Sequence, residues 1–475
     1  MIGLLNRIRG RRRAGGLLIA AACSLSSTAA CSNPPRPRNI VILCIDTLRA
    51  DHLGVYGYAR DTSPRIDELA ARGVVFEHAY SHSPWTVPST ASLLTSQLPR
   101  EHGAGLSGRL DRNLRTSPPG KVSESAISIA QALKEAGFRS ALLSANPFVA
   151  GSFQRGFDMA VSERQSASQL TDRAIQWLEE DDSAPFLLYM QYVDLHEPTQ
   201  PPEPFASAFP VSERAGPRTE AHKKWGFGKL SGPEQAGFES FKEHKLALYD
   251  GALRYVDSEL GRLLERIDGL VGLDTTLVVV VSDHGEEFWD HAAIERQLGG
   301  DPRGIWGIGH GHSMFEEQLH VPLIFAGPGL GGGRLDCEVG LIDVVPTLLE
   351  ALGVEIPPAM RGSSLNSLLR AGGRDDCPDK PVIAESPAYG PDTNAVVWRR
   401  HKLIQRADGV DLLYSLRDDP QERDETGSPR VLEGLRGVLA AHRETAVSDP
   451  SGAMTYDEDT RSQLESLGYL SPPQK

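Results

Sequence analysis

The chain has 475 residues, of which 40% are hydrophobic, so it is long enough to bury a large core or to form two or three domains. Its 49 basic and 63 acidic side chains give a formal net charge of −14 at pH 7. A surface of that sign repels a phosphate backbone, so we expect no nucleic acid among the partners.

The N-terminal residues have the composition of a secretory signal. Five arginines lie within residues 7–13, and a stretch of apolar and small residues follows over 14–30. This stretch is too short and too rich in small residues for a stable membrane span. We therefore predict a signal peptide over residues 1–31 and export to the bacterial periplasm or cell envelope.

Two cysteines in this region are candidates for lipid attachment. Cys23 and Cys31 each follow three small residues, an arrangement that resembles a bacterial lipoprotein signal. A proline-rich stretch over 32–38 would then serve as a tether. We expect contact with a membrane only through such an N-terminal lipid. An ordinary cleaved signal peptide is the alternative.

Strand-like and helix-like patterns alternate over residues 39–375. Continuous apolar runs predict strands over 40–45, 74–76, 140–144, 186–192, 277–281 and 319–325. Helices are predicted from Ser63 (as cap), after Thr86, and over 125–136, 168–177, 245–267 and 342–352. The segment 200–242 shows no clear period and is predicted to be a long loop with short helices. The alternation predicts an α/β/α sandwich around a mainly parallel sheet.

The pattern changes near residue 376. Short strand-like runs over 382–385, 395–398, 402–404 and 411–414 predict a small antiparallel sheet, and a helix is predicted over 430–445. We therefore divide the mature chain into a catalytic α/β domain over 39–375 and a C-terminal α+β subdomain over 376–475. Cys337 and Cys377 would be able to pair in an oxidising compartment, although their separation in sequence does not decide this.

Side chains of metal-ligand type follow two of the predicted strands. Asp46 ends the first apolar run, and Asp283 and His284 follow the run over 277–281. Open α/β sheets place their sites at the carboxyl ends of strands. Thr86 lies between these segments and offers a hydroxyl that a metal can activate to attack an ester. Helix caps or turn hydroxyls are the ordinary roles of such residues.

Six segments, in the same order along the chain, resemble the sulfatase family within the alkaline phosphatase superfamily. They span residues 41–54, 85–90, 282–287, 309–324, 343–349 and 467–469. The resemblance implies the α/β/α sandwich of the alkaline phosphatase type with a small C-terminal antiparallel sheet and helix. It also implies one divalent metal ion, held by Asp46, Thr86, Asp283 and His284. The nitrogen ligand favours zinc or manganese over calcium, which prefers oxygen.

The resemblance also assigns the reacting groups. Thr86 corresponds to the nucleophile, and His196 to a substrate-binding histidine after a strand. His310 corresponds to a residue that stabilises charge on the transferred group or the leaving oxygen. His312 lies two residues further on in the same glycine-rich loop and is an alternate for substrate binding.

Two departures from the family bear on the chemistry. Thr47 stands where many sulfatases have a second acid. Sulfatases that make formylglycine convert a Cys or Ser followed by x-Pro-x-Arg, whereas this chain has Thr86 and, in the arginine position, Thr90. Phosphoethanolamine transferases and lipoteichoic-acid synthases of the same superfamily use an unmodified threonine and act on phosphorus.

The resulting hypothesis is a metal-dependent hydrolase of sulfate or phosphate esters with Thr86 as an unmodified nucleophile. It favours phosphoester hydrolysis or transfer of a phospho group, with an anionic ester such as a glycan or lipid headgroup as substrate. One alternative is a non-catalytic envelope protein of the same fold that binds an anionic glycan or lipid headgroup. Another is a sulfatase with a modified residue.

Overall fold

The computed structural model describes residues 35–106, 111–149, 151–181, 183–219, 236–299, 301–305, 307–371, 377–445 and 452–470. The predicted signal peptide, Cys23 and Cys31 lie outside these residues. Pro35–Lys475 forms one unit. Within the described part of the chain, no helix is both long and apolar enough to cross a membrane.

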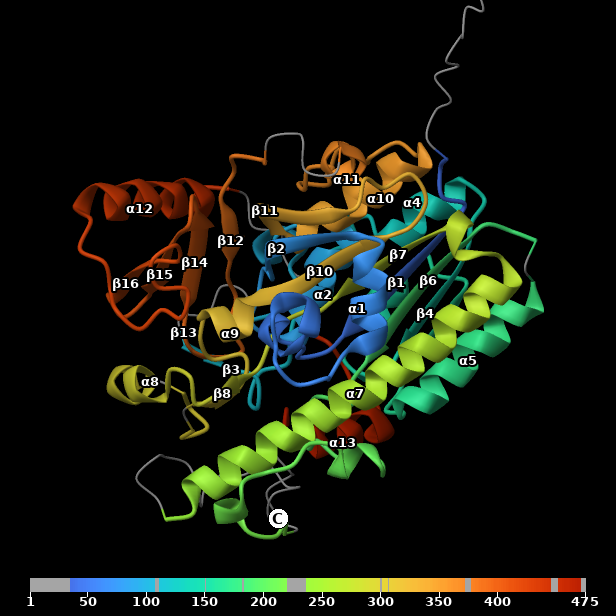
Figure 1. The fold of residues 1–475 in the computed structure, drawn as a ribbon. Helices are drawn as coiled ribbons and strands as arrows, with labels where there is room; N and C mark the ends of the chain where they lie inside the picture. Colours follow the sequence, from blue (N-terminus) through green and yellow to red (C-terminus); the bar gives the residue numbers. More distant parts are fainter. Residues whose placement is uncertain are drawn as a thin grey trace, which may run out of the picture. The chain divides into compact units, whose positions relative to one another are not determined.

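An eight-stranded sheet forms the centre of this unit (Figure 1). Its strand order is β11-β2-β10-β7-β1-β6-β4-β5. In chain order the strands are β1 (Asn39–Ile45), β2 (Val74–Tyr80), β4 (Arg139–Ser144), β5 (Met159–Ser162), β6 (Phe186–Tyr192), β7 (Thr276–Val281), β10 (His320–Ala326) and β11 (Gly333–Gly340). β10 runs antiparallel to both of its neighbours, and the other pairs are parallel. The carboxyl ends of β1, β2, β4, β6 and β7 therefore lie at the same end of the sheet.

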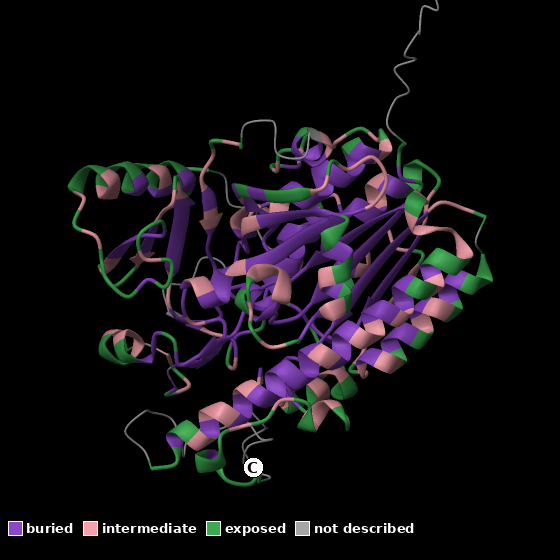
Figure 2. Cartoon of the chain, viewed as in Figure 1, coloured by how far each residue is buried: buried purple, intermediate pink, exposed green. Residues whose placement is uncertain are grey.

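Helices cover both faces of this sheet, as predicted (Figure 1). One layer contains α1 (Pro64–Ala71), α5 (Ala167–Glu180) and α7 (Phe238–Leu270). The other contains α2 (Thr86–Thr95), α4 (Ile129–Glu135), α10 (Val344–Leu352) and α11 (Asn366–Ala371). Between the layers the sheet is buried (Figure 2), and every residue of β1, β6 and β7 is inaccessible to solvent. The continuous apolar runs arise from this burial on two faces.

The two outermost strands were not predicted. β5 and β11 lie at the two edges of the sheet and are only partly buried. β11 includes glycine, arginine and acidic residues, so it lacks the apolar run that marks an interior strand.

Ser63 is the N-cap residue of α1, as predicted, whereas α7 begins at Phe238 rather than at 245. Ser63 makes no side-chain capping bond, however. The carboxylate of Asp257, from α7, instead accepts hydrogen bonds from the backbone N–H groups of Arg65 and Ile66, at 3.1 and 2.8 Å. α4 begins at Ile129 rather than at 125, because the side chain of Ser128 caps it.

The predicted C-terminal sheet and helix are present. The sheet contains β12 (Val382–Ala384), β14 (Thr393–Trp398), β15 (His401–Arg406) and β16 (Asp411–Ser415), all antiparallel. α12 (Pro429–Arg443) packs against β14 and β15. A disulfide joins Cys337, in β11, to Cys377.

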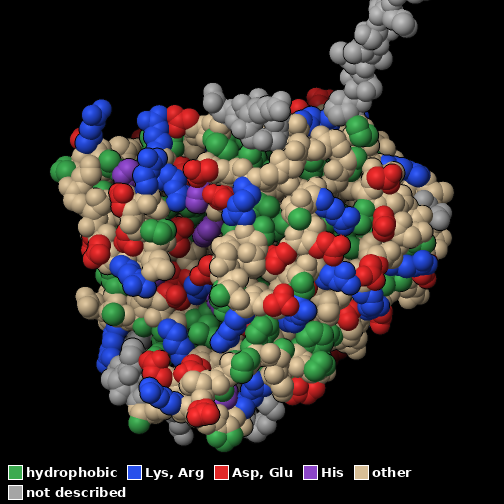
Figure 3. Space-filling model, viewed as in Figure 1, with side chains coloured by type: hydrophobic (Ala, Val, Ile, Leu, Met, Phe, Trp, Pro, Cys, Tyr) green, Lys and Arg blue, Asp and Glu red, His purple; other side chains and the backbone are tan. Residues whose placement is uncertain are grey.

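The remaining helices and strands are short. Their bounds are α3 (Pro99–His102), β3 (Asp111–Asn113), β8 (Glu287–Phe288), α8 (Ala292–Leu298), β9 (Ile308–Gly309), α9 (Glu316–Leu319), β13 (Tyr389–Pro391) and α13 (Glu458–Ser466). β3 pairs with β13, and β8 pairs with β9. On the face shown in Figure 3, acidic and basic side chains are interspersed.

Candidate active site

The structure brings the three candidate metal ligands of the strand ends together. Asp46 directly follows β1, and Asp283 and His284 follow the adjacent strand β7. All three are fully buried, and one ligand atom of each lies within 4.8 Å of the others. Nε2 of His284 is 3.7 Å from Oδ1 of Asp46 and 3.6 Å from Oδ2 of Asp283.

The electrostatics of this cluster fit a cation. Burial, with the nearby charge of Asp283, raises the pKa of Asp46 to about 8, and burial raises the pKa of Asp283 to about 7. Oδ1 of Asp46 is buried and has no hydrogen-bond partner among the described residues. Nδ1 of His284 donates to the carbonyl oxygen of Gly285 at 2.9 Å, so the lone pair of Nε2 faces the carboxylates. Two buried carboxylates and an imidazole nitrogen are a donor set for a divalent transition metal.

Two amide side chains that we did not predict hold these carboxylates. Nδ2 of Asn146 donates to Oδ2 of Asp46 at 2.7 Å. Nε2 of Gln191 donates to Oδ2 of Asp46 and Oδ2 of Asp283 at 3.1 and 3.2 Å. Asn146 follows β4 and Gln191 lies near the carboxyl end of β6, so both lie at the same end of the sheet as Asp46. A polar residue at the end of an apolar run was the available signal in each case.

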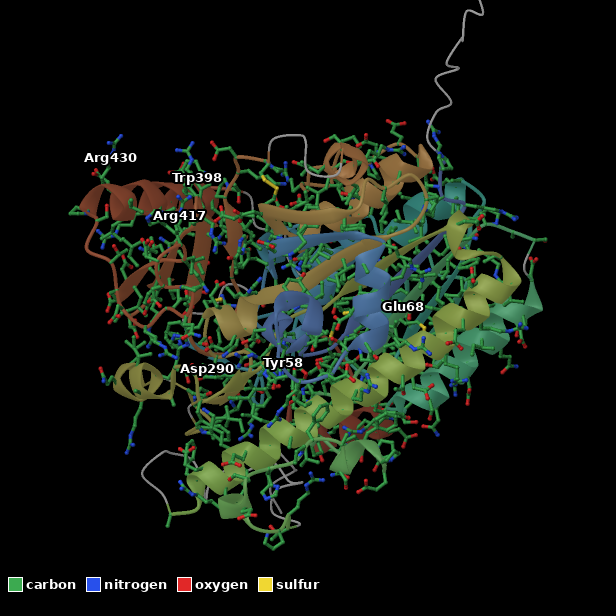
Figure 4. All side chains as sticks on the ribbon, viewed as in Figure 1. Tyr58, Glu68, Asp290, Trp398, Arg417 and Arg430 are labelled. Atoms are coloured by element: carbon green, nitrogen blue, oxygen red, sulfur yellow. A yellow bond between two sulfur atoms is a disulfide. The ribbon has the colours of Figure 1, made fainter. Side chains whose placement is uncertain are left out.

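Salt bridges tie together the two loops that contain the ligands. The guanidinium group of Arg49, three residues after Asp46, pairs with Asp51 and with Asp290, each at 2.7 Å. Asp290 lies in the loop beyond Asp283 and is labelled in Figure 4. The relative position of the Asp46 and Asp283 carboxylates therefore also depends on the salt bridge between Arg49 and Asp290.

Thr86 lies beside the carboxylate cluster at the N-terminus of α2. Its Oγ1 is 3.3 Å from Nε2 of His284 and 3.3 Å from Nδ2 of Asn146. Trp85 occupies the N-cap position and makes no side-chain capping bond. The positive end of the helix dipole therefore favours negative charge at this position.

His196 and His310 form the other side of the group. Their ring centroids are 4.9 Å apart, and the His310 ring is 4.4 Å from that of His284. Nδ1 of His310 lies 3.1 Å from the carboxylate of Glu286. Nδ1 of His196 donates to the carbonyl oxygen of Glu197 at 2.6 Å, and its buried Nε2 has no hydrogen-bond partner in the part of the chain that the structure describes. Burial lowers the pKa of both rings well below the ordinary value, so both are neutral.

The structure does not place His312 in this group. Its Nε2 lies 3.0 Å from Glu287 and 3.1 Å from Glu295. Burial alone lowers the pKa of His312, but the charges and hydrogen bonds of these two carboxylates raise it well above the ordinary value. Gly311, with φ of +84°, turns the chain between the two histidines. A cationic His312 paired with two buried acids has a structural role here.

Tyr469 completes the group and was not assigned to it from the sequence. Its hydroxyl oxygen lies 3.3 Å from Oγ1 of Thr86 and 3.4 Å from Nε2 of His310. It comes from the last described residues of the chain, beyond α13. The segment 467–469 resembles the C-terminal motif of the family, but sequence spacing alone gives no indication that Tyr469 reaches Thr86.

The fold and this site are those of a hydrolase in the alkaline phosphatase-like superfamily. A family model described as Sulfatase matches residues 38–354. The chain therefore belongs to the sulfatase family, a family of ester hydrolases.

Two relatives match along most of their length. Delta 4,5-hexuronate-2-O-sulfatase of Bacteroides thetaiotaomicron is 22% identical over 490 residues, which cover 93% of this chain and 96% of that protein. An arylsulfatase of Clostridium perfringens is 25% identical over 455 residues and covers 81% of this chain and 89% of its own.

Solved structures share the fold. A protein in complex with its substrate D-glucosamine-2-N,6-O-disulfate superimposes with a TM-score of 0.69 and 19% identity, covering 86% of this chain and 98% of that chain. The phosphonate monoester hydrolase of Agrobacterium radiobacter superimposes with a TM-score of 0.65 and 20% identity, covering 89% and 98%.

Proposed function

We propose that the protein is a metal-dependent hydrolase of anionic esters in which unmodified Thr86 is the nucleophile, and that phosphate esters are favoured over sulfate esters. The observation that carries the proposal is the position of Oγ1 of Thr86. It lies 3.3 Å from Nε2 of His284, next to two buried carboxylates and at the positive end of α2. The positive end of the helix favours the deprotonated form of that hydroxyl, and a cation held by the two carboxylates would lower its pKa further.

Asp46, Asp283 and His284, together with Thr86, would hold one divalent cation, and the imidazole ligand favours zinc or manganese. When bound, such an ion lowers the pKa of a coordinated hydroxyl and neutralises charge on the ester. Asn146 and Gln191 keep the Asp46 carboxylate in place by donating to its Oδ2. These two contacts orient the ligand set before any substrate binds.

His196 and His310 form the histidine side of the site, which would bind the leaving group. The carboxylate of Glu286 fixes the ring of His310 through Nδ1, and the backbone carbonyl oxygen of Glu197 fixes the ring of His196 through Nδ1. Each ring therefore presents Nε2 to the interior of the site. A neutral imidazole in this position accepts a hydrogen bond, and after taking up a proton it donates one to the leaving oxygen.

The identity of the nucleophile supports phosphorus as the reacting atom. After displacement, a phosphorylated threonine can be hydrolysed by water at phosphorus. A sulfated threonine lacks the second hydroxyl with which a hydrated formylglycine expels sulfate, so its turnover would require slow attack at sulfur. Two structural neighbours are phosphonate monoester hydrolases, from Agrobacterium radiobacter and Silicibacter pomeroyi. A neighbour solved with a carrageenan-type neocarrahexaose supports a glycan as the esterified group, and a lipid headgroup is the other candidate.

The test is turnover of matched aryl phosphate monoester, phosphodiester and sulfate substrates by metal-replete protein. Thr86→Ala should abolish turnover, whereas Thr86→Ser keeps a hydroxyl and should retain activity. Thr90→Val is the matched control, because Thr90 lies one turn further along α2 and its buried hydroxyl has no partner among the described residues. Retained turnover in Thr86→Ala would contradict the nucleophile assignment. Faster cleavage of the sulfate than of both phosphates would contradict the preference for phosphorus.

We also propose export to the bacterial periplasm or cell envelope, with a lipid on Cys31 or Cys23. The disulfide between Cys337 and Cys377 supports an oxidising compartment. Mass spectrometry of the mature N-terminus tests this directly. A diacylglyceryl cysteine at either position supports the lipid anchor, and an unmodified N-terminus excludes it.

A further inference from the structure

The C-terminal segment reaches the candidate nucleophile through a defined turn. α13 ends at Ser466, and Gly468 has φ of +78°, which turns the chain back toward the sheet. The backbone N–H of Tyr469 donates to the carbonyl oxygen of Leu464 at 3.1 Å. Leu464 and Leu467 are buried in the main core. Tyr469 is therefore held by the same apolar packing that holds the rest of the site.

Neighbouring rings fix the orientation of the Tyr469 side chain. Its ring lies 4.6 Å from that of Phe148, in an edge-to-face arrangement, and 5.0 Å from that of His196. Only 3% of Tyr469 is exposed. With the ring fixed on both sides, the hydroxyl has little freedom and remains close to Thr86.

The contacts of the hydroxyl differ from those of the other groups around Thr86. His284 and Asn146, two other polar neighbours of Oγ1, also face Asp46. Tyr469 instead faces His310, at 3.4 Å from Nε2. Tyr469 therefore links the nucleophile to the histidine side of the site through its hydroxyl, while the ring of His284 lies between Thr86 and His310. Distances of 3.3 to 3.4 Å are long for such contacts, which commonly tighten only when substrate binds.

We propose that Tyr469 is a catalytic residue of this enzyme. In the resting enzyme its hydroxyl orients the hydroxyl of Thr86, and during attack it donates a hydrogen bond to an oxygen of the transferred group. Any group bonded to Oγ1 must lie within reach of a hydroxyl that is only 3.3 Å away. A fixed donor in a site closed to water stabilises developing negative charge more strongly than water does. This inference rests on the proposed function of Thr86.

The first test compares two tyrosines of the same segment. Tyr469→Phe removes only the hydroxyl. Tyr456→Phe is the matched control, because its ring also packs on Phe148, at 5.9 Å, whereas its hydroxyl faces the sulfur of Met454. Loss of one such donor lowers kcat by about 100-fold or more. We expect that loss for Tyr469→Phe with KM within about threefold and an unchanged Tm, and no change for Tyr456→Phe. A merely structural role would lower Tm and leave kcat per folded molecule intact.

The second test does not depend on turnover. Orthovanadate adopts the five-coordinate geometry of phosphoryl transfer, so its binding to the metal-replete protein, measured by calorimetry, reports the same contact. Tyr469→Phe should weaken vanadate binding about tenfold, a typical value for one hydrogen bond to a charged group. Wild-type kcat and vanadate affinity in Tyr469→Phe, with Thr86→Ala inactive, would overturn this inference alone. Activity in Thr86→Ala would overturn the proposed nucleophile, and a wild-type protein with neither turnover nor vanadate binding would overturn both.

Discussion

Replacing Asp46 with asparagine removes a carboxyl group that the fold buries beside a second carboxyl group, that of Asp283. The pKa of Asp46 rises from its ordinary value of 3.8 to about 8 in the folded protein, through burial and the charge of Asp283. At pH 7 the carboxyl group lies about three pH units above its ordinary pKa, and each unit corresponds to about 1.4 kcal/mol. Keeping Asp46 buried at pH 7 therefore costs the metal-free protein on the order of 4 kcal/mol.

The sign of the pH dependence follows from the raised pKa. The folded state binds more protons than the unfolded state between pH 4 and 8. The contribution of Asp46 to stability is therefore fully present below its ordinary pKa of 3.8 and is lost as the pH rises through about 8. Between pH 5 and pH 7 the loss amounts to roughly 2 to 3 kcal/mol. Asparagine does not titrate, so Asp46→Asn should lack this loss.

Urea denaturation of the metal-free protein at pH 5 and pH 7 measures the effect. We expect Asp46→Asn to be more stable than the wild type by about 4 kcal/mol at pH 7 and by only about 1 to 2 kcal/mol at pH 5. Asp61→Asn is the control, since the Asp61 side chain is 75% exposed. Added Mn²⁺ or Zn²⁺ should stabilise the wild type and not Asp46→Asn, because the ion binds only a complete ligand set. If Asp46→Asn is less stable than the wild type at pH 7 without metal, the argument from burial is wrong.

Two further predictions concern the histidine loop and the disulfide. His310→Asn should lower kcat by about 100-fold with a small change in Tm. His312→Asn should mainly lower Tm, because it leaves Glu295 buried without its partner. Equal losses of kcat in both variants would contradict this assignment. The disulfide between Cys337 and Cys377 closes a loop with a sequence separation of 40. Its reduction should lower the free energy of unfolding by about 4 kcal/mol. An unchanged urea midpoint under reducing conditions would refute that value.

The sequence by itself determined the interior of the fold. Strands buried on both faces must be apolar throughout, so β1, β6 and β7 are visible as continuous runs. The carboxyl ends of these strands are also predictable, because each apolar run ends where polar residues begin. This is why Asp46 and Asp283 could be placed together, at the carboxyl ends of parallel strands, before any coordinates were known.

Only the tertiary structure decided which side chains complete the site. Asn146 follows an apolar run as Asp46 does, and Gln191 lies near the end of one. An amide at a strand end has many ordinary roles, however, and its hydrogen bonds depend on strand order. The choice between His310 and His312 depended on the turn at Gly311 and on where Glu295 lies. Tyr469 is 383 residues from Thr86 in sequence, and a contact between residues so far apart is set by how the C-terminal segment packs on the core, which no local pattern encodes.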